Sequence, residues 1–356
     1  MELKDLNTKR TLQTGVAYHG NRMPSHARYD LEQIAKADMD VVVHMLSHID
    51  WTRHKKPLTD VFRMTESLGM EVWVDNWGMA GAPGDSSHFL CAHPDGHMMF
   101  SNGQMHPKIV CYNNPEFHQF AKDWLDTVVE MGAKTVFWDE PCMPKRSLGE
   151  GLGEAYTCAC PRCQKLFEEK YGRPMPLLED EQVAEFRKDT LVNFFRVVTD
   201  YAATLGIRNT CCFMPGEYMH MLDTVREVAA LPHMDNLGVD PYWYSRNRYK
   251  QPYEYVYGYT KQMMDITNEY HKDHNLWIQT YAVPAGREEE IVQATEAAYD
   301  AGARCLLAWS YAGGESNDYR ADLPERTWIA TVEAMRRVRS MERDRILEEN
   351  RAKYRK

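Results

Sequence analysis

Short apolar segments alternate with longer amphipathic segments eight times along this chain, and no other feature of the sequence constrains its fold as strongly. The apolar segments are brief, contain many β-branched and aromatic residues, and are bounded by Gly, Pro, Asn or Asp. This pattern is typical of parallel strands that are buried on both faces. It predicts strands at 14–20, 40–46, 71–77, 134–140, 209–215, 236–243, 276–282 and 304–311.

The longer segments carry apolar residues at helical spacing. Between residues 114 and 132, for example, Phe117, Trp124 and Val128 fall on one face, and the pattern stops at Gly132, as helices commonly do. Comparable patterns predict helices at 29–38, 58–69, 114–132, 179–206, 222–231, 255–273, 287–302 and 323–344. Eight strand-then-helix units in one chain predict a (β/α)8 TIM barrel of the α/β class.

A doubly wound open sheet is the main alternative to the barrel. That fold usually carries a glycine-rich phosphate-binding loop after its first strand, and AYHGNRMPSH at 17–26 has no G-x-G-x-x-G pattern. We therefore expect one barrel domain over residues 1–356, which includes a charged C-terminal helix at 324–356. The loops after the third and fourth strands, at 78–113 and 141–178, are enlarged and lie where barrel enzymes carry their active sites.

Charge and hydropathy exclude several classes of partner. The chain has 42 Lys and Arg against 52 Asp and Glu, and its net charge of −10 leaves no basic surplus to neutralise nucleic-acid phosphates. No apolar run approaches the roughly 20 residues that span a bilayer. The first ten residues, MELKDLNTKR, are polar, unlike a secretion signal. We expect a cytoplasmic protein without nucleic-acid or membrane partners, and we leave a homo-oligomer open.

Three cysteines lie close together in the motif TCACPRC. Cys158, Cys160 and Cys163 form a C-x-C-x-x-C arrangement, which can converge on one tetrahedral ion if a fourth ligand comes from elsewhere. The candidates for that ligand are the other cysteines outside predicted strands, Cys91, Cys111 and Cys142. The motif predicts a structural Zn²⁺, because four sulfur ligands leave no open position for catalysis. No sequence feature indicates an organic cofactor.

Residues 111–172 resemble a known family through three consecutive motifs, CYNNPEFHQFAKDWL, VFWDEP and CACPRCQKLFEEKYG. The segment resembles the zinc-bearing glycoside hydrolase family 42 β-galactosidases, which belong to the (β/α)8 superfamily. The resemblance implies that Cys111 is the fourth zinc ligand and that Glu140 is the general acid/base. Two positions depart from the family: Asp139 stands where the family has Asn, and the strand at 276–282 has no carboxylate where the family has its nucleophile. The double-displacement mechanism of that family is therefore not carried over.

Polar and aromatic residues stand at the ends of the predicted strands, which converge on one pocket in a barrel. Cleavage of a glycosidic bond needs a protonated carboxyl and a second group that attacks the anomeric carbon or activates water. We expect the catalytic residues to be Glu140, Asp139 and Asp240. The expected substrate-binding residues are His19, His44, Asp75, Trp77, Glu217, Tyr242, Tyr281 and Trp309.

Glu140 is the expected general acid. In a regular strand Asp139 and Glu140 point to opposite faces, but a sharp exit at Pro141 would turn Glu140 into the pocket. A neighbouring carboxylate and apolar walls would then raise its pKa. Asp240 is the first choice for the second group and Asp75 the second choice. Attack by the substrate's own acetamido group, or by Tyr281 as nucleophile, also stays open.

Three functions are consistent with these residues. The first is a glycoside hydrolase that cleaves an O-glycosidic bond of a carbohydrate substrate. The second is a divalent-metal-dependent sugar isomerase or aldolase, with Glu140, Asp240 and a histidine as ligands. The third is a non-catalytic carbohydrate-binding relative of a hydrolase, which the missing carboxylate on the seventh strand makes credible.

Overall fold

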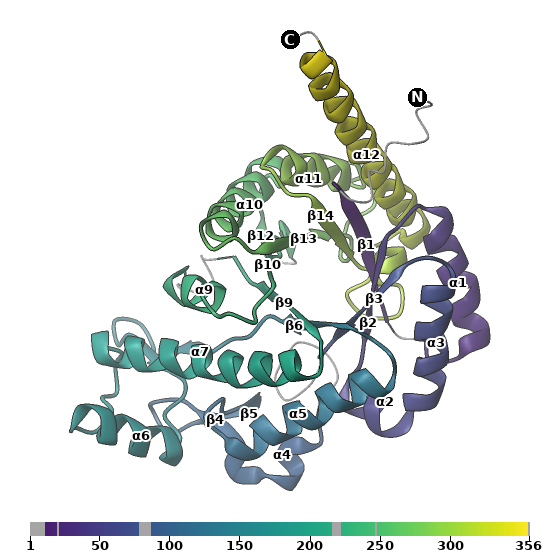
Figure 1. The fold of residues 1–356 in the computed structure, drawn as a ribbon. Helices are drawn as coiled ribbons and strands as arrows, with labels where there is room; N and C mark the ends of the chain where they lie inside the picture. Colours follow the sequence, from purple (N-terminus) through teal and green to yellow (C-terminus); the bar gives the residue numbers. More distant parts are fainter. Residues whose placement is uncertain (1–10, 20, 78–86, 216–221, 246–247, 355–356) are drawn as a thin grey trace. The chain divides into compact units, whose positions relative to one another are not determined.

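A computed structural model describes residues 11–19, 21–77, 87–215, 222–245 and 248–354. Within these ranges eight parallel strands form a closed barrel in the order β1-β14-β13-β10-β9-β6-β3-β2 (Figure 1). They are β1 (Gln13–Tyr18), β2 (Val41–Met45), β3 (Glu71–Asp75), β6 (Thr135–Asp139), β9 (Arg208–Phe213), β10 (Asn236–Val239), β13 (Asp273–Gln279) and β14 (Cys305–Trp309). The prediction of a (β/α)8 barrel is confirmed, and each of the eight predicted strands overlaps an observed one.

The helices between the strands begin and end where the local sequence favours it. Helix α5 has Pro115 at its first position, and the side chain of Asn114 accepts a hydrogen bond from the backbone N–H of Glu116. Asp180 caps α7 in the same manner, through the backbone N–H of Val183. The larger helices are α1 (Pro24–Lys36), α3 (Lys55–Ser67), α5 (Pro115–Glu130), α7 (Glu181–Thr204), α9 (Leu222–Ala229), α10 (Pro252–Glu269), α11 (Glu289–Asp300) and α12 (Pro324–Tyr354). No helix in the described ranges combines the length and the apolar character that a membrane crossing requires.

The two enlarged loops contain short elements of their own. The loop after β3 includes α4 (Phe89–Ala92) and the hairpin of β4 (His97–Met99) and β5 (Met105–Val110). The loop after β6 includes the hairpin of β7 (Lys145–Ser147) and β8 (Glu154–Tyr156), followed by α6 (Pro161–Tyr171). The sixth strand was predicted at 236–243 but ends at Val239, and a further small hairpin follows, made by β11 (Tyr244–Ser245) and β12 (Arg248–Tyr249).

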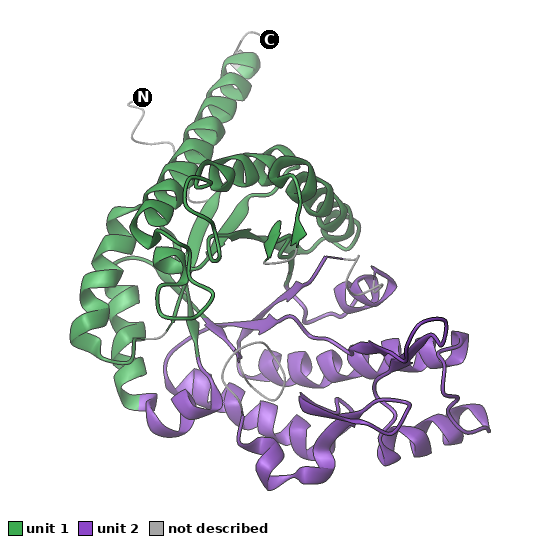
Figure 2. Ribbon diagram, turned by 180° about the vertical axis from the view of Figure 1, so that it is seen from behind, with its two compact units in different colours: residues 1–45, 56–73, 236–356 green, residues 46–55, 74–235 purple. Residues whose placement is uncertain are grey.

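The chain divides into two compact units (Figure 2). Unit 1 comprises residues 1–45, 56–73 and 236–356, and unit 2 comprises residues 46–55 and 74–235. In unit 1, β1 pairs with β2 and β14, and β13 pairs with β10 and β14. In unit 2, β6 pairs with β9, while α5 and α7 run side by side.

Gly238 on β10 gives a direct test of the packing in unit 1. A Cβ at this position would lie 2.0 Å from Oδ1 of Asn275 and 2.4 Å from its backbone oxygen. Asn275 cannot easily move, because it donates to Asn236 at 2.6 Å and accepts from the indole N–H of Trp277 at 3.0 Å. We expect Gly238→Ala to lower the free energy of unfolding by about 1–3 kcal/mol, measured by chemical denaturation.

The matched control for this prediction is Gly258→Ala on α10. Gly258 is exposed in the middle of the helix, and a Cβ there meets no atom within 4 Å. Because alanine favours a helix over glycine by roughly 0.5–1 kcal/mol, this second substitution should raise stability. Equal effects of the two substitutions would contradict the packing described for Gly238.

Candidate active site and metal centre

The ends of β3 and β6 bring three carboxyl groups together in unit 2. The two strands are neighbours in the barrel. Beyond their ends, the backbone N–H of Asn76 donates to the carbonyl of Phe137 at 3.2 Å, and Oδ1 of Asn76 accepts from the backbone N–H of Asp139 at 3.0 Å. These two hydrogen bonds of Asn76 hold the end of β3 against β6, and Asp75 and Asp139 are the last residues of the two strands. Glu140 follows directly, and we refer to Asp75, Asp139 and Glu140 as the carboxyl cluster.

The direction of Asp139 follows from the packing of its neighbour. Trp138 is buried against the helices of unit 2: its ring centroid lies 5.5 Å from that of Trp124 on α5 and 6.2 Å from that of Phe194 on α7. Its indole N–H donates to Oδ1 of Asn209 at 3.1 Å. Because side chains alternate along a strand, Asp139 points to the opposite face, away from these helices.

Glu140 leaves the strand in an uncommon backbone conformation. Strand β6 ends at Asp139, and Glu140 has φ of +36°, on the left-handed side that residues with a Cβ seldom occupy. Holding a residue in such a conformation costs on the order of 1–3 kcal/mol, and positions of this kind gather at functional sites. The sharp exit expected at Pro141 is thus present one residue earlier, at Glu140 itself.

The carboxyl cluster is poorly solvated and has no basic partner in the described part of the chain. Asp75 is 0% exposed and Asp139 is 9% exposed, whereas Glu140 is half-buried. Both carboxylate oxygens of Asp75, and Oδ2 of Asp139, make no hydrogen bond of good geometry. None of the three carboxyls forms an ion pair with the Lys, Arg and His residues in the described ranges.

Burial is the main cause of the raised pKa values of the two aspartates in the cluster. It raises the pKa of Asp75 well above its usual value, and the charge of Glu140 adds to the effect, while the backbone N–H of Trp77 opposes it. The pKa of Asp139 is also raised, first by burial and then by the charges of Asp75 and Glu140. Asp75 and Asp139 therefore hold their protons to higher pH than solvated aspartates do. Sequence reasoning placed the raised pKa at Glu140 and did not anticipate this effect at its two neighbours.

The expected binding residues of unit 1 form two aromatic pairs. His19 stacks on Trp309 with ring centroids 5.7 Å apart, and Nδ1 of His19 lies 3.2 Å from the hydroxyl of Ser316. Tyr242 and Tyr281 meet edge to face at 5.1 Å. Aromatic faces and edges of this kind suit a ligand with both apolar and hydroxyl-bearing surfaces.

Other expected binding residues have different surroundings. His44 is 2% exposed, its Nε2 lies 2.9 Å from the hydroxyl of Thr65, and burial lowers its pKa to about 3, so its contacts are those of a neutral core histidine. Trp77 is half-buried beyond the end of β3, and Asp240 is buried beyond the end of β10 in unit 1. Glu217 lies outside the described residues.

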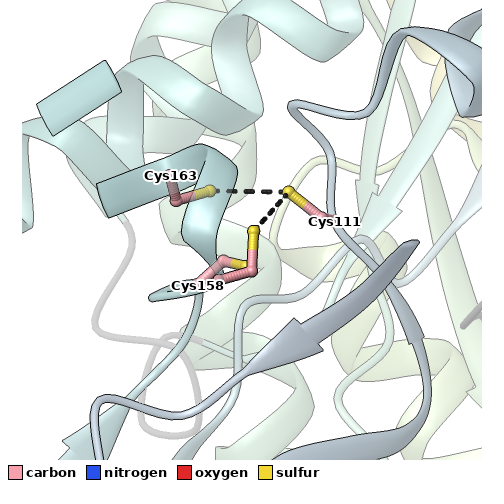
Figure 3. Close-up of side chains that lie close together, drawn as sticks. Cys111, Cys158 and Cys163 are labelled. Carbon is pink, nitrogen blue, oxygen red and sulfur yellow. Dashed lines mark hydrogen bonds between the residues drawn. The ribbon is translucent and has the colours of Figure 1, made fainter. Parts of the chain in front are cut away.

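Four buried cysteines form the second feature of unit 2. Cys111 follows β5, Cys158 and Cys160 precede α6, and Cys163 lies on its first turn. Their four sulfur atoms all lie within 4.8 Å of one another. Figure 3 shows Cys111 facing Cys163, with 3.4 Å between the two sulfurs. A group of this kind can hold a metal ion, and it brings together the end of the first enlarged loop and the middle of the second.

The four thiols change one another's pKa values. Hydrogen bonds with the other three thiols, that with Cys111 first, lower the pKa of Cys160, whereas bonds with Cys158 and Cys160 raise the pKa of Cys111 and the bond with Cys111 raises that of Cys163. The side-chain amide of Asn113 also donates to the sulfur of Cys163 at 3.4 Å, as outer partners of metal ligands commonly do. Of the three candidates for the fourth sulfur, Cys111 is the one in the group; Cys91 is exposed, and Cys142 lies outside it.

Comparison with known proteins identifies the architecture. No protein-family model matches the sequence, and no curated protein matches it. GH5_18 from Bifidobacterium longum subsp. longum ATCC 55813, in complex with Manb1-4GlcNAc, has a TM-score of 0.59 at 11% identity, over 92% of this chain and 79% of that one. A putative alpha-L-fucosidase from Bacteroides thetaiotaomicron VPI-5482 has a TM-score of 0.53 at 9% identity, over 93% and 96%. D-psicose 3-epimerase from Clostridium cellulolyticum H10 has a TM-score of 0.51 at 11% identity, over 92% and 99%.

The shared feature is the fold. All three proteins share the TIM-barrel fold with this chain. Because their sequence identities are only 9–11%, the similarity shows the fold and not the function.

Sequence reasoning missed two supporting residues of the site. Asn76 aligns the ends of β3 and β6, and the hydroxyl of Tyr112 accepts a hydrogen bond from the backbone N–H of Cys142 at 3.2 Å, which holds the chain just after Glu140. Asn76 lies in the segment VDNW at the end of a predicted strand, and this position could have marked it as a residue of the site. Tyr112 and Cys142 are 30 residues apart in the sequence, so no local sequence pattern indicated their contact.

Proposed function

We propose that this protein is a glycoside hydrolase in which Glu140 donates a proton to the departing glycosidic oxygen. The observation that carries the proposal is the carboxyl cluster: three acids at the ends of two neighbouring strands, with no basic partner among the described residues. Burial and neighbouring charge raise the pKa values of Asp75 and Asp139, and surroundings that disfavour carboxylate charge suit a general acid.

The three carboxyls have different access to a substrate. Glu140 is the member that is half-exposed, so it is the one that reaches the scissile bond, while Asp75 and Asp139 stay buried behind it. In the first step the Glu140 proton passes to the glycosidic oxygen as the bond from that oxygen to the anomeric carbon breaks. The charge left on Glu140 is one reason that the neighbouring carboxyls hold their own protons more firmly.

The second group of the reaction attacks the anomeric carbon or removes a proton from an attacking water. Asp240 remains our first choice, as base or nucleophile, because it follows directly on the end of β10. Asp75 is less suited to either role than the sequence suggested, since burial raises its pKa and disfavours the charged form that a base or nucleophile needs. The two aromatic pairs of unit 1, His19 with Trp309 and Tyr242 with Tyr281, are proposed to contact the carbohydrate.

We propose that the four cysteines hold a structural Zn²⁺. Four sulfur donors, buried and mutually close, are the ligand set of closed tetrahedral zinc sites. The resemblance of residues 111–172 to zinc-bearing family 42 β-galactosidases supports the same ion. Because all four positions would be taken by protein, the ion would fix the two enlarged loops and take no part in the chemistry.

The pH dependence of the reaction tests the electrostatics of the cluster. Asp75→Asn removes a charge that opposes the ionisation of Asp139, so the carboxyl cluster should lose its proton at lower pH. The alkaline limb of the profile of kcat/KM against pH is therefore expected to move to lower pH. A limb that stays in place, or moves to higher pH, would contradict the coupling of the three carboxyls.

A screen of hydrolysis on a panel of glycosides, run with and without EDTA, separates the proposed function from its alternatives. No hydrolysis, together with isomerisation or aldol cleavage of free sugars that EDTA abolishes and Mg²⁺ or Mn²⁺ restores, would favour the metal-dependent sugar isomerase or aldolase. Saturable sugar binding by calorimetry with no product from any glycoside would favour the carbohydrate-binding protein. Thermal stability measured in the same samples shows whether EDTA has merely removed the ion from the four cysteines.

A further inference from the structure

A cavity of about 230 Å³ lies in unit 1, beyond the ends of β1 and β14. Its walls come from the segment after β1, from α1 and from the turn after β14, where the residues include Tyr18, Asn21, Asp30, Ser310, Tyr311 and Glu315. The volume is below the roughly 300–1,000 Å³ of pockets that take drug-sized ligands, so it suits a ligand of about one sugar ring. Residues of the carboxyl cluster take no part in it.

Asp30 organises the polar wall of this cavity. Its Oδ2 accepts the hydroxyl of Tyr18 at 2.7 Å and the side-chain amide of Asn21 at 3.4 Å, and its Oδ1 accepts the hydroxyl of Tyr311 at 3.3 Å. Burial and the neighbouring Asp30 raise the pKa values of both tyrosines, so both stay neutral and donate their protons to the carboxylate. The lone pairs of the two phenol oxygens are left for a ligand.

The cavity contains more hydrogen-bond acceptors than donors. None of the ten residues that line it is Lys or Arg, and neither Asp30 nor Glu315 forms an ion pair among the described residues. Ser310 is 1% exposed, and its hydroxyl makes no hydrogen bond. A buried polar group without a partner is uncommon in proteins, and at the wall of a cavity it indicates a ligand that completes it.

We infer that this cavity binds a sugar unit that carries a protonated amine. An ammonium group offers three donors and no acceptor, which complements a wall of carboxylate, phenol and hydroxyl oxygens. The hydroxyls of the ring would meet Ser310 and the side-chain amide of Asn21. The described wall has two carboxylates and no Lys or Arg, with His19 as its imidazole, and this balance of charge disfavours a sugar acid. The inference concerns binding within unit 1 and stands whether or not Glu140 performs the proposed hydrolysis.

Calorimetric titration of the full-length protein with glucosamine, glucose and glucuronate tests the inference, at a mildly acidic pH where the amine is protonated. We expect glucosamine to bind about tenfold more tightly than glucose, and glucuronate to show no saturable binding. Equal affinities for glucosamine and glucose, binding of glucuronate, or no binding of any of the three would overturn it.

Three variants place the binding in the cavity. Asp30→Asn and Glu315→Gln should each remove most of the preference for glucosamine over glucose. Glu315 is exposed and has no ion pair among the described residues, so its variant remains informative if Asp30→Asn is unstable. Asp318→Asn removes an exposed carboxylate in the same turn but outside the cavity, and it should keep the full preference. If Glu315→Gln and Asp318→Asn behave alike, the amine does not bind in this cavity.

Discussion

Glu140→Gln is expected to lower kcat on an unactivated glycoside by about 10²–10⁴-fold, the usual contribution of a general acid. Glutamine has nearly the same shape as glutamate but has no proton that it can give to the departing oxygen. Its amide still fits the half-buried position beyond β6, so the fold and the affinity for substrate should persist. Steady-state kinetics, together with thermal denaturation and substrate titration of both proteins, checks each part of this result.

The matched control is Glu150→Gln. Glu150 is an exposed glutamate in the loop that follows the same strand, and it forms no ion pair among the described residues. Its substitution changes the net charge equally but leaves the carboxyl cluster intact, so kinetics should equal those of the parent. Parent-like turnover in Glu140→Gln would exclude the proposed role of Glu140.

Loss of one sulfur from the four-cysteine group should have the largest effect on stability. Structural zinc contributes roughly 10–16 kcal/mol of binding free energy in small zinc domains, and three ligands hold the ion less tightly than four. We expect Cys163→Ser to reduce bound zinc from one equivalent per chain and to lower the Tm by about 10 °C. Metal analysis by mass spectrometry and differential scanning calorimetry are the two measurements.

Cys91→Ser is the control for this experiment, because Cys91 is exposed and lies outside the group. It should keep both the zinc content and the Tm. Limited proteolysis adds a local readout: in Cys163→Ser the loop at 141–178 should be cleaved faster, since the proposed ion would join it to the loop before α5. A Cys163→Ser protein with a full equivalent of zinc and an unchanged Tm would contradict the metal site.

The fold could be predicted from the sequence because its signals are local and repeated. Each strand is an apolar run with turn residues on either side, and a helix such as α5 has its cap, its first-turn proline and its apolar face within one segment. The errors fell at the ends of elements. The segment at 236–243 was predicted to be one strand, but the strand ends at Val239 and a small hairpin follows.

The site could be predicted only in part, because its properties come from contacts between distant segments. A barrel places strand ends together, and this rule was enough to select Asp75, Asp139 and Glu140 as candidates. It does not say which side chain is desolvated, so the raised pKa values of the two aspartates were missed. The same limit applied to His44, whose partner Thr65 lies 21 residues away on α3.

The most direct test of the account is the dependence of the Glu140→Gln defect on the leaving group. A glycoside with a strongly acidic phenol as leaving group departs without protonation, whereas a sugar or alkyl leaving group needs the proton. We predict that kcat/KM of Glu140→Gln, relative to the parent, is close to unity for the acidic phenol and very low for the alkyl glycoside. An equal loss on both substrates would show that Glu140 does not donate the proton.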